Sequence, residues 1–237
     1  MPPYRLTEPA VFTFVLIPVL LVIALAWCTV WAWRRAGASP PAARRAGLSA
    51  TFAAGSWMAL TWAAAASGIF RQWDRDPPPF ALLVVGVIGV AVTLSFGTIG
   101  RQIATQAPLW LLVAIQSFRL PLELAMHGLY ERGIMPVQMS YSGRNVDIIT
   151  GATAVVVALL VKTGRGGRGL VALWNVLGLG LLVNVVVVAI LSTPRFSYFG
   201  NDHLNVFVTY PPFVWLPAVM VVAALAGHLV IFRALSR

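Results

Sequence analysis

Long apolar runs alternate with short polar segments along almost the whole chain, and most runs have the length that crosses a bilayer. A transmembrane helix needs about 20 predominantly apolar residues. Seven runs bounded by charged residues, prolines or glycines fit this description: residues 10–33, 48–70, 80–99, 108–130, 147–162, 169–192 and 207–232. The pattern predicts an all-α membrane protein, a seven-transmembrane helix bundle in which residues 1–237 form a single polytopic domain.

Composition supports the membrane class, because 59% of the residues are hydrophobic and only 10% are charged. Soluble domains carry roughly 25% charged residues. The first run is longer than the apolar core of a signal peptide, about 7 to 15 residues, so we expect residues 10–33 to be a retained span. The single cysteine, Cys28, leaves no partner for an internal disulfide and no cysteine cluster for a metal.

Basic residues are distributed unevenly between the two sides of the predicted bundle. One side would hold ten basic residues and no acid: Arg34, Arg35, Arg44, Arg45, Arg101, Lys162, Arg165, Arg168, Arg233 and Arg237. The other would hold six basic residues and six acids: Arg5, Arg71, Arg75, Arg132, Arg144, Arg195, Glu8, Asp74, Asp76, Glu131, Asp147 and Asp202. The positive-inside rule then predicts an N-terminus outside and a cytoplasmic C-terminus.

The net charge of +10 therefore lies mainly on the cytoplasmic side, where it orients the chain and contacts anionic lipid. Nucleic acid is not an expected partner, because the basic residues occur in short turns without interleaved aromatics. We expect an integral, multi-pass protein of the bacterial cytoplasmic (inner) membrane, with the lipid bilayer as its first partner.

Residues 108–130 contain the most informative polar positions, Arg119, Glu123 and His127, each one helical turn from the next. At about 100° per residue these side chains share one face of a helix, with Gln116 and Tyr130 in the same sector. Ionisable groups at membrane depth cost several kcal/mol, about 2.5 to 3.5 on insertion scales, and are often functional. The stripe predicts a face that points into the bundle or toward a cavity.

A structural alternative stays open, in which Arg119 and Glu123 neutralise each other and lock helices together. Pro121 lies between them and cannot donate to the carbonyl of Ser117, so we expect a kink there. His127 would then be an interfacial residue bonded to a loop.

Further polar residues lie at the outer ends of the last four spans. Asp147 is either an N-cap or a site residue, Asn184 is either helix glue or a ligand contact, and Tyr210 is either an interfacial aromatic or part of a cavity wall. Asn175 is nine residues from Asn184, on the opposite helix face, and Asn184 is the expected site member. The predicted ligand-binding set is Arg119, Glu123, His127, Tyr130, Arg144, Asn145, Asp147, Asn184, His203 and Tyr210.

Three function classes follow. The preferred hypothesis is an outward-facing polar pocket in the last four spans that binds, and in its extended form transports, a small polar solute or ion. The alternative is a metal-assisted or acid-base membrane enzyme, with Glu123, His127 and His203 as metal candidates and His127 and His203 as conceivable haem ligands. The third is an accessory subunit of a membrane complex. The residues identify neither the reaction nor the cofactor.

The seven-span topology resembles that of microbial rhodopsins and of SWEET sugar carriers. The only lysine, Lys162, lies in the fifth span, and the seventh has none to hold retinal. An internal three-helix repeat of the SWEET kind is also absent from the sequence. Neither resemblance transfers a functional residue to this chain.

Overall fold

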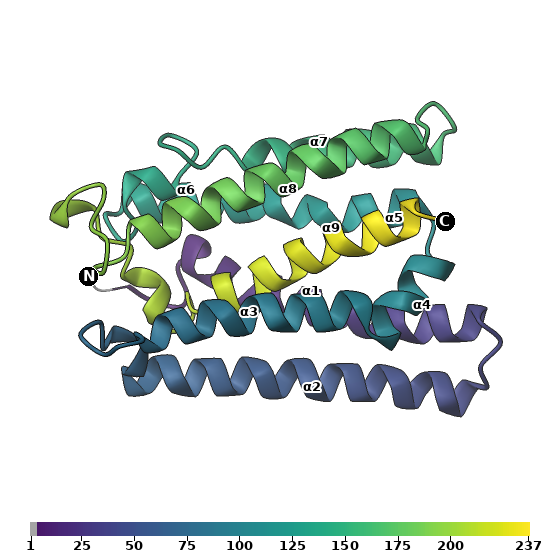
Figure 1. Cartoon of the computed structure of the whole chain (residues 1–237), viewed down its shortest axis with the longest axis horizontal. Helices are drawn as coiled ribbons and strands as arrows, with labels where there is room; N and C mark the ends of the chain where they lie inside the picture. Colours follow the sequence, from purple (N-terminus) through teal and green to yellow (C-terminus); the bar gives the residue numbers. More distant parts are fainter. Residues whose placement is uncertain (1–3) are drawn as a thin grey trace.

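The computed structural model describes residues 4–237 as a bundle of helices, without a strand in that range (Figure 1). The long helices are α1 (Pro9–Arg35), α2 (Pro40–Ser67), α3 (Pro79–Phe96), α7 (Ile148–Lys162), α8 (Arg168–Leu191) and α9 (Val222–Leu235). Shorter elements are α4 (Thr98–Gln106), α5 (Leu109–Ile115) and α6 (Arg119–Glu131). Helix α4 was not predicted from the apolar pattern; it follows α3 directly after Gly97.

Within residues 4–237, five helical segments are long and apolar enough to cross a membrane: Pro9–Arg35, Pro79–Phe96, Leu109–Glu131, Arg168–Leu191 and Leu216–Leu235. They establish an integral membrane protein by length and composition. Of the two other predicted spans, α2 is long but rich in alanine, glycine, serine and tryptophan, and α7 is apolar but short. Large apolar side chains lie exposed on the outer surface of the long helices, for example Ile23 of α1, Val85 of α3 and Leu177 of α8. Exposed side chains of this type suit contact with lipid.

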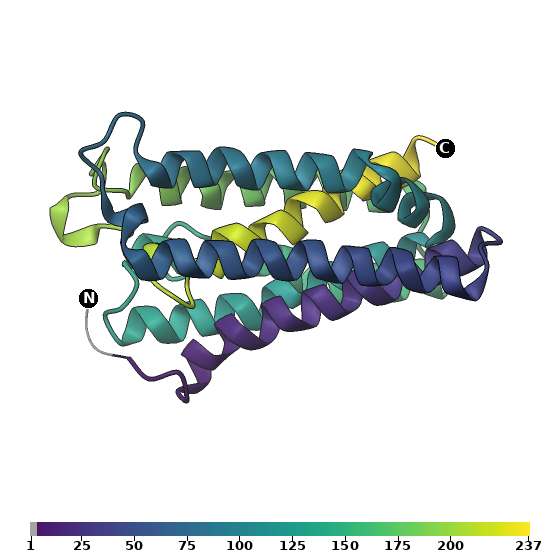
Figure 2. The same cartoon turned by 90° about the horizontal axis from the view of Figure 1, so that it is seen from below.

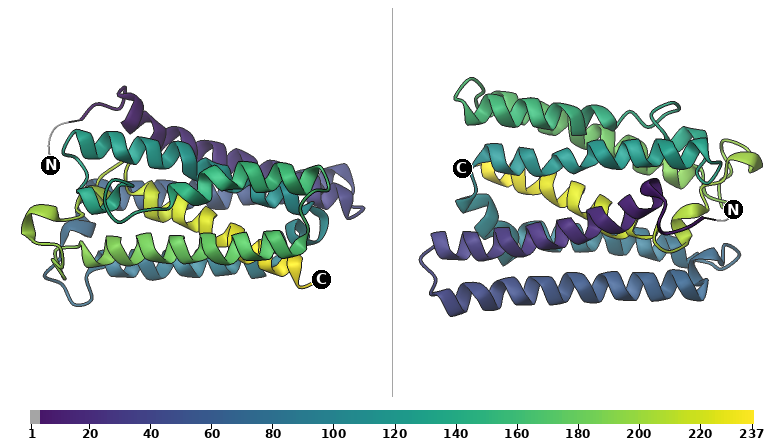
Figure 3. Two further views of the ribbon diagram at one scale, coloured as in Figure 1. Left: turned by 90° about the horizontal axis from the view of Figure 1, so that it is seen from above. Right: turned by 180° about the vertical axis from the view of Figure 1, so that it is seen from behind.

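The helices run roughly along one long axis, and α9 crosses the middle of the bundle obliquely between α3 and α8 (Figure 1). The beginning of α1 and the C-terminus lie at opposite ends (Figure 3). Figure 2 shows α1 slanting across the long, straight α2, against which it packs. On its other side α1 contacts α6, while α7 packs against α5 and α6. Helix α8 in turn packs against α7 and α9, so that α6, α7, α8 and α9 surround one interior.

Two of the segments that could span the membrane are interrupted, and a proline lies close to each interruption. A 3-10 turn over Gln116–Phe118 separates α5 from α6, one turn before Pro121. The segment Leu216–Val221, which contains Pro217, is a π-helix that continues into α9. Proline lacks the N–H that the regular ladder uses, so neighbouring backbone carbonyls are left for other donors. The Trp57 indole donates to a carbonyl within this π-helix, with Nε1 at 2.7 Å from the oxygen of Ala218.

The entrance to the last helix is irregular from residue 207 to residue 214, a stretch that contains Pro211 and Pro212. The Tyr4 hydroxyl donates to the carbonyl of Pro211 in this segment. Burial raises the pKa of the Tyr4 phenol, Tyr210 raises it further, and Arg71 opposes both. The hydrogen bond from Tyr4 attaches the start of the described chain to the entrance of the last helix.

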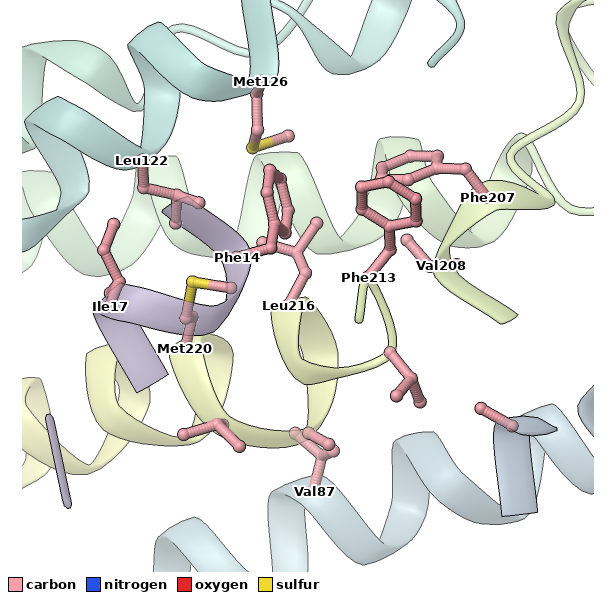
Figure 4. Close-up of a cluster of buried hydrophobic side chains, with 14 of the residues drawn as sticks. Phe14, Ile17, Val87, Leu122, Met126, Phe207, Val208, Phe213, Leu216 and Met220 are labelled. Atoms are coloured by element: carbon pink, nitrogen blue, oxygen red, sulfur yellow. The ribbon is translucent and has the colours of Figure 1, made fainter. Parts of the chain in front are cut away.

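The apolar core consists of two clusters at different levels of the bundle. The larger joins α1, α3 and α6 to residues 207–226, and Figure 4 shows Phe14, Met126 and Leu216 converging in it. The smaller joins α4, α5, α7, α8 and the end of α9. In chain order along α9, Ala226 belongs to the first cluster, Val230 to the second, and His228 lies between them. The two clusters meet at a buried polar layer.

Candidate functional site

Arg119 is the largest fully buried side chain among residues 4–237. Its Nε lies 2.6 Å from Oδ2 of Asp147, and its Nη2 pairs with Oδ1 of the same carboxylate. The pair is bidentate, the geometry in which guanidinium and carboxylate bind most strongly. The hydroxyl of Thr150 also donates to Oδ1, at 3.1 Å. Arg119 therefore pairs with Asp147 across the α6–α7 contact, and the alternative pairing of Arg119 with Glu123 is wrong.

His228 extends the network to α9. Nη1 of Arg119 lies 2.8 Å from Nε2 of His228, and Nδ1 of His228 lies 2.8 Å from Oδ1 of Asn175 on α8. A guanidinium can only donate, so Nε2 must accept, and the proton of the neutral ring lies on Nδ1. The Asn175 amide nitrogen completes the arrangement by donating to the carbonyl of His228, at 3.1 Å. We call Arg119, Asp147, Thr150, His228 and Asn175 the polar lock.

The polar lock joins four helices, and two glycines let their backbones approach closely enough. A Cβ on Gly151 of α7 would lie 2.3 Å from the backbone nitrogen of Leu120. A Cβ on Gly178 of α8 would lie 2.7 Å from Cε1 of His228 and 2.8 Å from Cγ2 of Thr150. Contacts this short do not occur for real side chains, so the network requires glycine at both positions.

Glu123 lies one turn from Arg119 but has a different environment. Its Oε2 accepts a hydrogen bond from the Asn145 amide at 2.8 Å, and the same amide nitrogen lies 2.9 Å from the carbonyl of Met139. Only 2% of Glu123 is exposed. None of the ion pairs found in residues 4–237 includes Glu123. The protein therefore buries this carboxyl group with amide hydrogen bonding and without a cationic partner.

A cavity of about 230 Å³ adjoins Glu123. Its walls come from α3 and α8, and α6 and residues 216–225 close its inner side. Apolar side chains make up nearly all of the lining, and the exceptions are Arg119, Glu123, Asp147 and Asn205. Asn205 is 1% exposed, its amide nitrogen donates to the carbonyl of Ala189, and its Oδ1 has no hydrogen-bond partner. Since Arg119 and Asp147 satisfy each other, the remaining acceptors of the lining are Glu123, which holds one hydrogen bond from Asn145, and Asn205, whose Oδ1 has none.

His127 belongs to a third environment, at the loop that follows α6. Its Nδ1 lies 2.9 Å from the hydroxyl of Ser140 and 3.3 Å from that of Ser142, and Tyr141 stacks on the ring. Its Nε2 is 3.6 Å from the exposed carboxylate of Glu131. Tyr130 lies beside the same ring, at 5.7 Å between centroids. The stripe on α6 is thus divided among three sets of partners.

The remaining predicted residues lie in or next to the loops that follow α6 and α8. Arg144 is exposed, with its guanidinium over the Phe199 ring, and its carbonyl accepts a hydrogen bond from Asn184. His203 is also exposed, and its carbonyl accepts from Gln138. Tyr210 receives the Arg71 guanidinium on its ring at 4.3 Å. These four predicted residues contact loops, while Asn145 and Asp147 join the buried groups.

Asp147 does precede α7 as its N-cap residue, but its side chain makes no capping hydrogen bond. Sequence reasoning missed His228, Asn175 and Asn205 as partners of the buried groups. The available signal was that His228 and Asn175 are polar residues inside apolar spans. The depth of these two residues along their separate helices had to be known before they could be identified as members of the network around Arg119. Asn175, rather than Asn184, joins the buried network.

The metal candidates do not come together. Within the part of the chain that the structure describes, no group of three or more His, Cys, Asp or Glu side chains is placed to hold a metal ion. Glu123 bonds to Asn145, His127 bonds to Ser140, and His203 lies on an exposed turn. The three candidates therefore occupy three separate environments.

Comparison with known proteins identifies a family. Residues 77–236 match the family described as a domain of unknown function, DUF8737, and the chain belongs to it. The matched region begins just before α3 and contains the polar lock, Glu123, Asn205 and the whole cavity lining. No curated protein and no solved structure matches the chain.

Proposed function

We propose that this chain is a seven-transmembrane protein of the bacterial inner membrane, in which α2 and α7 complete the set of spans. At 1.5 Å per residue, α2 is about 42 Å long and easily spans the hydrocarbon layer. The 15 residues of α7 reach about 22 Å, so it crosses only a thinned or protein-lined region. The distribution of basic residues supports an outside N-terminus and a cytoplasmic C-terminus.

The function we propose is binding of a small molecule in the cavity beside Glu123, with transport as an extension of the same hypothesis. The observation that carries it is a buried carboxyl group at the cavity wall without a cationic partner. Such a group is costly inside a membrane unless a proton or a ligand compensates it. The polar lock satisfies its own charges, so its role in this proposal is to hold α6 to α9 in place around the cavity.

A hydrophobic carbodiimide tests this proposal, because it enters bilayers and modifies protonated carboxyl groups accessible from the apolar phase. We expect dicyclohexylcarbodiimide to label Glu123 in nanodisc-reconstituted protein and to leave the ion-paired Asp147 unlabelled. Mass spectrometry of peptides locates the adduct. Glu123→Gln should abolish it, and Glu131→Gln, which changes an exposed carboxylate on the same helix, should not. A folded protein without the adduct on Glu123 would overturn the binding site and favour the accessory-subunit hypothesis.

One observation favours a second candidate, the acid-base enzyme. His127 lies within hydrogen-bonding distance of two serine hydroxyls, and Glu131 is near its other nitrogen. A histidine between a hydroxyl and a carboxylate is the arrangement that activates serine nucleophiles. A fluorophosphonate probe should then label the exposed Ser142 in wild-type protein and fail to label it in His127→Gln. Equal labelling of the two proteins would reject this candidate.

A further inference from the structure

The cavity reaches the outer surface of the bundle between α3 and α8. Its lining includes Ile88 of α3 and Val183 and Val187 of α8, whose side chains are 49%, 53% and 46% exposed. These exposed residues belong to two of the segments that are apolar enough to cross a membrane. In Figure 1 α9 crosses between these two helices. The opening therefore faces lipid, and a molecule dissolved in the bilayer can enter sideways.

The lining excludes most classes of small polar solute. It is apolar apart from four residues, and two of those four neutralise each other in the polar lock. A sugar or an inorganic ion would lose its hydration in this cavity and find few groups to replace it. An apolar chain would instead keep its lipid-like surroundings along α3 and α8. The wall thus fits a ligand with a hydrocarbon tail.

The polar groups of the lining determine which head group such a ligand can carry. The Glu123 carboxyl and the Asn205 Oδ1 are both acceptors, and Oδ1 is buried without any donor. A head group that donates hydrogen bonds and carries positive charge satisfies both requirements, whereas an anionic head group without a cation would be repelled by an ionised Glu123. A volume of about 230 Å³ holds a head group and the first part of a chain, below the roughly 300 to 1,000 Å³ of pockets that enclose a whole drug-sized ligand.

We propose that the cavity binds the ammonium group of an amphiphile that enters laterally between α3 and α8, with Glu123 and Asn205 as its acceptors. This inference rests on the proposed binding function and names its ligand class. The ammonium group can come from a free long-chain amine or from the head group of an aminophospholipid. Both sources present the same donor to Glu123 and leave the hydrocarbon tail between the two helices.

Protection of Glu123 from dicyclohexylcarbodiimide provides the test. In nanodiscs of phosphatidylcholine, dodecylamine should reduce labelling of Glu123 severalfold, while dodecanoate and dodecanol should leave it unchanged. Asn205→Leu should weaken the protection by the amine without preventing labelling. Val206→Leu, a half-buried neighbour outside the cavity lining, is the matched control. Nanodiscs that contain phosphatidylethanolamine distinguish the two sources, since reduced labelling without added amine identifies the lipid head group.

The outcomes separate this inference from the binding function itself. If dodecylamine leaves the labelling of Glu123 unchanged, or if dodecanol blocks it equally, the ammonium ligand is overturned. The proposed binding site at Glu123 would still stand, because the carboxyl group is accessible. Folded protein in which Glu123 is not labelled would overturn both the ammonium ligand and the binding site. A Glu123 that dodecylamine protects equally well in Asn205→Leu and in wild-type protein would remove Asn205 from the site.

Discussion

The carboxylate of Asp147 holds the guanidinium of Arg119 in a bidentate pair between α6 and α7, with 1% and 5% of the two side chains exposed. The two residues are 28 positions apart in the chain, and a loop and a 3-10 turn separate their helices. Buried pairs of this kind contribute little net stability, yet loss of one partner leaves an uncompensated charge. The pair is therefore best tested by comparing single and double replacements.

Asp147→Asn should destabilise the protein strongly, because Arg119 then remains buried without its counter-charge. Breaking a buried pair costs about 3 to 5 kcal/mol, and the loss should appear as a lower midpoint of thermal unfolding in detergent. The double variant Arg119→Met with Asp147→Leu should recover most of this loss, since both charges are removed together. A double variant as unstable as Asp147→Asn would show that the pair itself is required.

His228 should be neutral with its proton on Nδ1, because Arg119 donates to Nε2 and Asn175 accepts from Nδ1. Nitrogen NMR of protein labelled in its three histidines measures the tautomer directly, and the signal missing from His228→Gln gives the assignment. Asn175→Leu removes the acceptor and should alter that signal. A His228 that carries both protons would contradict the network.

Gly178→Ala should weaken the α8–α9 contact, because the new methyl group would lie 2.7 Å from the His228 ring. Overpacking in a tight core costs about 1 to 3 kcal/mol. Gly180→Ala is the matched control two residues along α8, where no atom lies within 4 Å. Thermal unfolding should fall for the first variant and change little for the second. Equal effects would mean that helix propensity, and not crowding, sets the result.

Trp57→Phe should loosen α2 from the π-helical segment, because the indole loses its hydrogen bond to the Ala218 carbonyl. The expected loss is about 0.5 to 1.5 kcal/mol, the net contribution of one hydrogen bond. Trp62→Phe is the comparison, as Trp62 contacts Trp215 by its ring at 4.8 Å. A larger effect from Trp62 would indicate that packing, and not the hydrogen bond, holds α2.

The C-terminus should lie in the cytoplasm and residue 198, in the loop after α8, on the opposite side. Alkaline phosphatase and green fluorescent protein fusions at these two positions report the side, because the first is active outside the cytoplasmic membrane and the second fluoresces inside. An active phosphatase at the C-terminus would reverse the proposed orientation.

Much of the fold follows from local chemistry. Apolar length predicted helices at all seven runs, and Pro121 predicted a kink in the segment that the 3-10 turn interrupts. Residue type alone also marked Arg119 and Glu123 as costly at membrane depth, and both are buried. Helix α4 was not predicted because it is short and polar. The break at Gly97 separates it from the apolar α3.

The partners were decided by tertiary structure. Arg119, Glu123 and His127 share a helix face, so the sequence by itself determined that they are neighbours and that lipid is the wrong environment for them. Their division among Asp147, Asn145 and Ser140 depends on which helices touch α6 at each level. Those contacts depend on backbone approach at Gly151 and Gly178. The periodicity of a helix defines a face, but only packing determines what that face meets, because helix rotation and depth are set by all neighbouring helices together.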